Sequence, residues 1–274
     1  MNQKVGNFPG VTVDKKSGSF RIHENLVAKI TDLPGTYSLY PKRDDEWVSY
    51  KVLLNQDHTI KPDLLIVVAD ASNLKRNLLF CSQIIDLKIP VVIAFTMMDL
   101  AKKQGTQINI PGLERELGVP IVMVNPRKNK GLTDLKKAVS LQVENINNPP
   151  ARDFIDTSAL ATNAVNSLQQ MFPAVSRYAA VHYLINHEHF NLSGDQQEKI
   201  EQIETDNSFN PTKTQAEEIM QRYSRIKKIM HKNVTEEDTL KKHLFTDQLD
   251  DLLLHRFWGY IILLVVLFIL FQSV

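Results

Sequence analysis

The 274-residue chain has one cysteine, ten glycines and a formal net charge of only +1. The single cysteine excludes a disulfide framework and is typical of a reducing compartment. The near-zero charge leaves no basic excess to neutralise phosphates, so we expect no nucleic acid among the partners. The first residues contain no apolar stretch, which predicts no secretory signal. A chain of this length predicts about two globular domains.

One apolar run departs from this average composition. Residues 257–271 are apolar without interruption. As a helix they would extend about 22 Å, somewhat less than the ~30 Å of a hydrocarbon core. Basic residues at 241, 242, 255 and 256 precede the run, which favours a cytoplasmic location for the preceding domains. We expect residues 257–274 to begin a transmembrane helix; a buried core helix is the alternative.

Residues 1–146 alternate between strand and helix patterns. The predicted strands are 26–31, 64–68, 91–95 and 119–124, and the predicted helices are 78–87, 110–117 and 132–143. Such alternation predicts a parallel sheet that is covered on both faces by helices.

The pattern becomes purely helical after an Asn-Asn-Pro-Pro break at residues 147–150. Apolar stripes at helical spacing lie within residues 161–172, 219–230 and 240–253, and Pro211 follows a helix-starting Asn210. We expect a small helical bundle over residues 147–256.

Two early loops carry residues suited to a nucleotide phosphate and its metal ion. Asp32 follows the strand 26–31, where a carboxylate can hold Mg²⁺ through water, and Gly35 lets a backbone N–H approach a phosphate. The glycine- and proline-rich stretch 6–13 contains Thr12, whose hydroxyl can bind the same ion. Each pattern alone also fits an ordinary turn.

Two later loops have the chemistry to bind a purine base. Asp99 follows the strand 91–95, and its carboxylate can accept two hydrogen bonds from guanine that adenine cannot supply. A second loop follows the strand 119–124 and would close over the base. The candidate residues are Thr96, Met97, Asp99, Asn125, Pro126 and Arg127. Asp99 alone could equally be a helix cap, but four such loops follow the order of a Ras-like GTPase.

These stretches resemble the FeoB family of prokaryotic ferrous iron transporters. Residues 3–13 and 32–39 resemble its switch regions, and residues 68–78 and 250–259 also match its pattern. The resemblance implies an α/β Ras-like G domain with an incomplete, parallel-type sheet and flanking helices. A small all-α coupling domain, similar to a dissociation inhibitor (GDI-like), and a C-terminal transmembrane helix would follow. The implied domains are 1–146, 147–256 and 257–274.

The same resemblance implies cofactors, partners and location. It implies GTP or GDP with Mg²⁺ held by Thr12 and Asp32, and K⁺ held by the backbone carbonyls of Gly6 and Phe8. It implies that the nucleotide state gates a pore for Fe²⁺ in the remaining membrane domain. Membrane lipid, further copies of the chain and a small FeoA-like accessory protein are the other implied partners. The location would be the cytoplasmic side of the prokaryotic inner membrane.

The departures from the family pattern concern nucleotide binding. No Gly-Lys dipeptide occurs in the chain, so we expect the first strand, P-loop and first helix of the G domain to be missing and nucleotide binding to be weak. Thr96 replaces the usual Asn, and Pro126 has no N–H to donate, which predicts weakened guanine preference. Thr36 follows Gly35 where Ras-type enzymes have Gln, so any hydrolysis should be slow, and we assign no catalytic residue.

Two other functions fit parts of the pattern. A membrane-tethered pseudo-GTPase that acts as an interaction module would share these departures. A soluble ribosome-assembly GTPase should carry a basic RNA-binding domain, which the net charge disfavours. His187 and His189 suggest a metal site, but side chains two positions apart on a helix point apart.

Overall fold

The computed structural model describes residues 4–7, 14–23, 26–54, 61–144, 153–236 and 258–272. The strands are β1 Lys4–Asn7, β2 Asp14–His23, β3 Leu26–Asp32, β4 Leu65–Asp70, β5 Val91–Thr96, β6 Thr106–Ile108, β7 Ile121–Met123 and β8 Val234–Glu236. The helices are α1 Asp44–Leu53, α2 Leu74–Asp86, α3 Met98–Lys103, α4 Ile110–Leu117, α5 Leu132–Glu144, α6 Thr162–Met171, α7 Arg177–Asn186, α8 Gly194–Asp206, α9 Pro211–Asn233 and α11 Trp258–Gln272. Short 3₁₀ helices are η1 Ala71–Asn73, η2 Pro126–Lys128, η3 Thr157–Ala159 and η4 His187–His189.

A parallel sheet in the order β4-β5-β7 forms the centre of the first half of the chain. The central strand β5 has apolar side chains that are buried from Val91 to Phe95, as its uninterrupted apolar sequence predicts. The strand predicted at 64–68 is confirmed as β4, but the expected cover on both faces of the sheet is incomplete there. Among the described strands, β4 pairs only with β5, and its Val68 side chain is 67% exposed.

A separate antiparallel sheet in the order β1-β2-β3 contains the first predicted strand. The strand at 26–31 is confirmed as β3, but it pairs with β2 and not with the parallel sheet. β2 has a mostly polar sequence, so the apolar pattern did not predict it. Gly6, which we placed in a loop, lies in β1 opposite Lys15.

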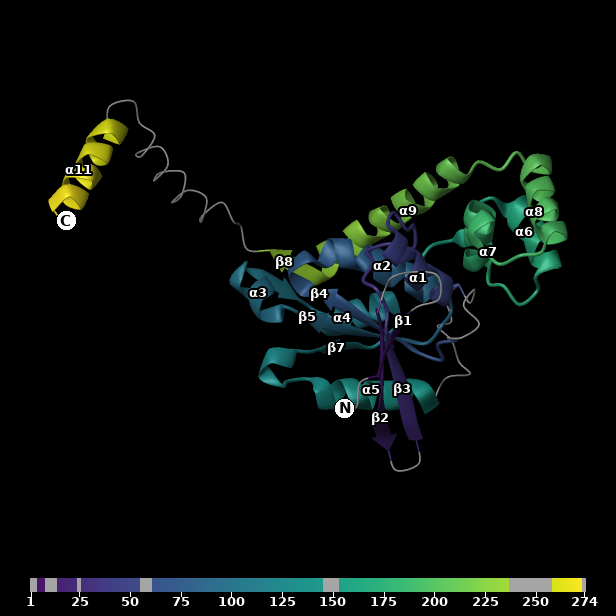
Figure 1. Cartoon of the computed structure of the whole chain (residues 1–274), viewed down its shortest axis with the longest axis horizontal. Helices are drawn as coiled ribbons and strands as arrows, with labels where there is room; N and C mark the ends of the chain where they lie inside the picture. The colour runs from purple at the N-terminus through teal and green to yellow at the C-terminus, as the bar shows by residue number, and fades with distance from the viewer. Residues whose placement is uncertain are drawn as a thin grey trace.

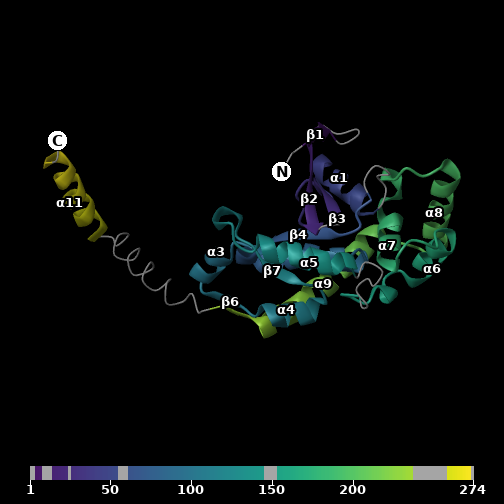
Figure 2. The same ribbon diagram turned by 90° about the horizontal axis from the view of Figure 1, so that it is seen from below.

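Helices cover the parallel sheet on its two faces (Figure 1). α9 and α2 pack together on one face, and α5 contacts β5 and β7 on the other. The view from below shows α5 across the strands, with α9 behind them (Figure 2). The predicted helices at 78–87, 110–117 and 132–143 correspond to α2, α4 and α5.

The helices α6 to α9 follow, and their core is continuous with that of the sheet. One cluster of buried side chains includes Ile93 of β5, Ile84 of α2, Val181 of α7 and Ile226 of α9. The stripe predicted within 161–172 is confirmed as the buried side of α6. The break at 147–150 and the stripe within 240–253 lie outside the described residues.

The buried side of α9 is rotated by a fraction of a turn from the apolar stripe predicted within 219–230. α9 buries Ile226 as expected, but Ile219 and Tyr223 are only partly buried. The centre of the buried side contains Glu218 and Arg222 instead, which periodicity of apolar residues cannot reveal.

The apolar run near the C-terminus forms α11, which lies away from the other elements in both views (Figures 1 and 2). Within the described part of the chain, no helix has the length and apolar character that a membrane crossing requires. The transmembrane helix stays a prediction.

Candidate functional site

The carboxyl ends of β5 and β7 bring the two predicted base-binding loops together. The strands are parallel and adjacent, and the Val124 N–H donates to the Phe95 carbonyl oxygen at 2.8 Å. The chain therefore leaves the sheet at neighbouring points, into residues 96–99 on one side and residues 125–127 on the other. Ligands of open α/β sheets bind at this edge.

The loop after β5 presents an apolar side chain and a carboxylate to solvent. Met97 has a left-handed backbone, with φ of 55°, and its side chain is 45% exposed. Asp99 is exposed, and its Oδ1 accepts the Leu100 N–H at 3.1 Å. Thr96 is turned the other way, since its Oγ1 donates to the Ala69 carbonyl of β4 at 3.3 Å. Thr96 therefore braces two strands.

The loop after β7 is a closed turn. Asn125 Oδ1 accepts the Lys128 N–H at 3.2 Å, and its backbone N–H donates to the Lys130 carbonyl at 2.9 Å. Pro126 and Arg127 are exposed at the tip of the turn. Gly131 closes it with φ of 81°, where an added Cβ would lie 2.0 Å from the Met123 carbonyl oxygen.

The loop after β3 also lies near this edge. Ser49 Oγ donates to the Pro34 carbonyl at 2.6 Å, and the Arg76 guanidinium lies 3.8 Å from the centre of the Tyr37 ring. Arg76 is in the first turn of α2, directly after β4 and η1, so residues 34–37 lie beside the carboxyl end of β4. Asp32 and Gly35 are exposed, and nothing lies within 4 Å of a Cβ added at Gly35. Thr12 and Phe8 lie outside the described residues.

These loops fit a purine base better than they fit phosphates. Asp99 offers an exposed carboxylate and Met97 an exposed apolar surface on the same loop. On the phosphate side, Asp32 is the one described carboxylate among the predicted Mg²⁺ ligands. The described residues contain no group of three or more His, Cys, Asp or Glu side chains that could hold a metal ion. Mg²⁺ there would depend on phosphate oxygens as further ligands.

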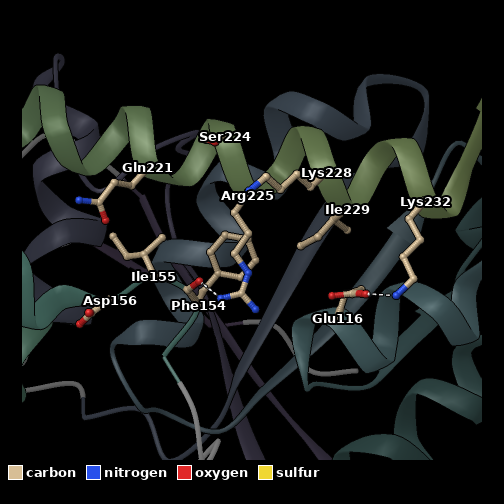
Figure 3. A pocket seen from close by; sticks show the side chains of 10 residues that line it. All are labelled: Glu116, Phe154, Ile155, Asp156, Gln221, Ser224, Arg225, Lys228, Ile229 and Lys232. Atoms are coloured by element: carbon tan, nitrogen blue, oxygen red, sulfur yellow. Dashed lines mark hydrogen bonds and ion pairs between the residues drawn. The ribbon is translucent and has the colours of Figure 1, made fainter.

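A groove of about 570 Å³ lies elsewhere, between α9, α4 and residues 154–156 (Figure 3). Lys232 forms an ion pair with Glu116 at 2.7 Å across it, and Arg225 donates to the Phe154 carbonyl. None of the residues predicted to bind the nucleotide lines this groove.

The two histidines that suggested a metal site have different surroundings. His187 is buried, with its Nδ1 at 3.3 Å from Glu204 Oε1. The exposed His189 has its ring centre 4.0 Å from that of Trp47.

Comparison with known proteins then identifies the family. A family model described as ferrous iron transport protein B matches residues 1–139. The chain belongs to this family. It is 30% identical to the Fe(2+) transporter FeoB of Leptospira interrogans over 298 residues, covering all of this chain and 40% of the relative. It is 31% identical to FeoB of Legionella pneumophila, covering 98% of this chain and 35% of the relative. The chain thus spans about two fifths or less of the length of these transporters.

Solved structures of FeoB share the fold. The cytosolic domain of L. pneumophila FeoB matches with a TM-score of 0.69 and 27% identity, over 86% of this chain and 91% of that one. A GDP-bound point mutant of the S. thermophilus FeoB G-domain matches with a TM-score of 0.65 and 31% identity, over 85% of this chain and 91% of that one. The described domains therefore have the Ras-like G-domain fold of FeoB cytosolic domains, with additional helices.

Proposed function

We propose that this chain is the GTP-binding regulatory region of a ferrous iron transporter. In this proposal the region lies on the cytoplasmic side of the membrane, and the nucleotide state of its loops controls passage of Fe²⁺ through the membrane domain. The observation that carries the proposal is that the two loops predicted to bind the base meet at the carboxyl edge of β5 and β7, beside the loop after β3. The family membership and the GDP-bound FeoB relative support it.

In this proposal Asp99 recognises the base. Its carboxylate would accept hydrogen bonds from N1–H and the exocyclic amine of guanine, while Met97 packs against the ring. Thr96 cannot add a donor to the base while its hydroxyl donates to Ala69. Pro126 adds none either, because proline lacks an N–H. We therefore propose that guanine is preferred over adenine only weakly.

The phosphate side would be held by few groups. When bound, Mg²⁺ would neutralise phosphate charge, and Asp32 and Thr12 are the residues proposed to hold it. The Gly6 and Phe8 carbonyls are those proposed for K⁺. Gly35 is exposed, and nothing lies within 4 Å of a Cβ added to it. Thr36 Oγ1 donates to Ser38 O at 2.7 Å, so this hydroxyl braces its own loop. With no Gly-Lys dipeptide in the chain, we propose weak nucleotide binding and slow turnover.

The remaining parts of the proposal concern the membrane. We propose that the apolar α11 belongs to the first membrane helix, with lipid around it and the rest of the transporter beyond it. Self-association and a small FeoA-like accessory protein are further proposed partners.

The substitution Thr96→Asn tests the base site. Asparagine restores a side-chain amide at this position, so we expect GDP to bind about five- to tenfold more tightly and ADP to be unaffected. The measurement is an NMR titration of the chain with GDP and with ADP, up to millimolar nucleotide, following amides of residues 96–99 and 125–128. Asp99→Asn is the matched control and should abolish any difference between the two nucleotides. Strong GDP preference in the unmodified chain would contradict the proposal.

The interaction module without nucleotide binding is the second candidate. It is favoured by the missing Gly-Lys dipeptide and by the inward-turned hydroxyl of Thr96. The same titration separates the two functions, because a folded chain whose amides do not respond to either nucleotide supports the module.

A further inference from the structure

A buried polar cluster connects α9 to the loop that follows Gly35. Glu218 and Arg222 come from α9, and Gln83 and Asp86 come from α2. The side chains of Glu218, Arg222 and Gln83 are fully buried, and Asp86 is 1% exposed. Charged groups this deep are found in proteins only with partners, so their arrangement is specific.

Arg222 is the centre of the cluster. Its Nη1 lies 2.8 Å from Asp86 Oδ2 and donates to the Ser82 carbonyl at 2.8 Å, while its Nε pairs with Glu218. The guanidinium also lies 4.6 Å from the centre of the Tyr178 ring. Burial raises the pKa of Asp86, and the positive charge of Arg222 opposes that shift. The cluster thus ties α9 to α2 by charge-assisted contacts.

Gln83 extends this cluster to the backbone of the loop. Its Nε2 lies 3.5 Å from Glu218 Oε1, and its Oε1 accepts the backbone N–H of Leu39 at 2.9 Å. Tyr178 donates to the same Glu218 oxygen at 2.7 Å. The neighbouring Tyr40 is also buried, and its pKa is raised by burial and then by the charge of Glu218.

The chemistry of the groups defines which way the Gln83 amide faces. Glu218 Oε1 accepts hydrogen bonds from the Tyr178 hydroxyl and from Arg222 Nε, so this oxygen acts as an acceptor and the NH₂ group of Gln83 must face it. The carbonyl oxygen must then face the loop, where the Leu39 N–H requires an acceptor. Glu218 therefore selects the amide orientation that the loop needs, although it does not touch Leu39 itself.

We propose that Gln83 positions the loop after Gly35 and that Glu218 orients Gln83. Through these two contacts a displacement of the loop is coupled to a displacement of α9. Loss of the Gln83–Leu39 or the Gln83–Glu218 contact leaves a buried polar group unpaired, and this cost disfavours intermediate positions of the loop. α9 is one continuous helix from Pro211 to Asn233, running from the helical region to β8 (Figure 1), so it can carry the displacement along its length. The inference rests on the proposed function in that the loop is taken to respond to nucleotide.

Hydrogen exchange of the whole chain, without nucleotide, tests the coupling. Glu218→Gln supplies an amide that can turn and present a donor to Gln83, so the orientation of Gln83 is no longer imposed. We expect amides of residues 36–40 to exchange about tenfold faster, while those of β5 are unchanged. Glu217→Gln is the matched control, because it makes the same change one residue earlier, where the side chain is 44% exposed.

Gln83→Met provides a second route to the same result. Methionine has a side chain of similar volume but makes neither hydrogen bond, so the amides of residues 36–40 should again exchange faster. Adding Glu218→Gln to this variant should give no further increase in exchange at these amides. The inference is overturned if the amides of residues 36–40 exchange at the same rate in Glu218→Gln as in Glu217→Gln. It is equally overturned if exchange rises as much in β5, since the cluster would then only stabilise the fold.

Adding GDP to the unmodified chain separates this inference from the proposed function. Unchanged exchange of residues 36–40 with GDP would count against the proposed nucleotide response. The coupling between Glu218 and Leu39 would stand, because it is measured without nucleotide.

Discussion

The two sheets of this protein differ in what surrounds them. In the parallel sheet, β5 has a strand on each side, and its five apolar residues from Val91 to Phe95 are buried. In the antiparallel sheet, β3 has no buried residue; Val27 is 61% exposed and Ile30 is 36% exposed. Because apolar burial supplies most of the stability of a fold, the parallel sheet must contribute far more than β3 does.

This difference extends to the candidate site. The loops of Thr96–Asp99 and Asn125–Arg127 leave the buried parallel sheet, whereas the loop of Asp32 and Gly35 leaves the exposed antiparallel one. The loops predicted to bind the base therefore leave a buried support. The loop predicted to bind the phosphate side depends on side-chain contacts such as those of Ser49 and Gln83.

Truncating one strand residue in each sheet tests the comparison most strongly. Phe95→Ala removes a fully buried ring, so we expect a loss of about 3–5 kcal/mol in the free energy of unfolding. Val27→Ala removes an exposed side chain and should cost about 0.5 kcal/mol or less. Urea unfolding followed by circular dichroism measures both. Equal losses for the two variants would show that β3 is packed as well as β5.

Adding a methyl group at one glycine in each region sharpens the comparison. Gly131 has a left-handed backbone, and its added Cβ would meet the Met123 carbonyl, so Gly131→Ala should cost about 1–3 kcal/mol. Gly35 has open space around it, so Gly35→Ala should change stability by about 0.5 kcal/mol or less. The same unfolding experiment applies. A large loss for Gly35→Ala would mean that the loop after β3 is tightly packed.

The same contrast explains which elements the sequence predicts. β5 is an uninterrupted apolar run, which reveals a strand buried on both faces. β2 is mostly polar because its surroundings are open, so no pattern marks it. The exposure of Val68 could not be foreseen from its own apolar neighbours, because it depends on whether other elements cover that face of β4.

The site was predictable in part for related reasons. Asp99 and Asn125 lie within a few residues of the ends of apolar strands, so their meeting at one edge follows from a parallel sheet. The buried charges of Glu218 and Arg222 were not predictable, since charged residues at helical spacing are typical of a solvated helix face. Only the packing of α9 on α2 shows that they face inward.

Buried titratable groups add a pH dependence to the stability of the fold. Burial, and then the charge of Arg222, lower the pKa of His182 from 6.5 to about 3. The unfolded chain therefore takes up a proton on this histidine below its ordinary pKa, whereas the folded chain does not. The free energy of unfolding therefore decreases as the pH falls from about 6.5 towards about 3. Asp86 acts in the opposite sense, because its raised pKa gives stability that is lost as the pH rises.

His182→Asn isolates the histidine contribution, since Asp86 is present in both proteins. From about pH 7.5 to about pH 5.5 the unmodified chain should lose about 1 kcal/mol more stability than the variant. Urea unfolding at each pH measures the difference, with His231→Asn on the exposed side of α9 as the control for the substitution itself. Parallel pH profiles for the unmodified chain and His182→Asn would mean that His182 takes up its proton over the same pH range in the folded and the unfolded chain. The buried region would then lack the pH response that its histidine is expected to give.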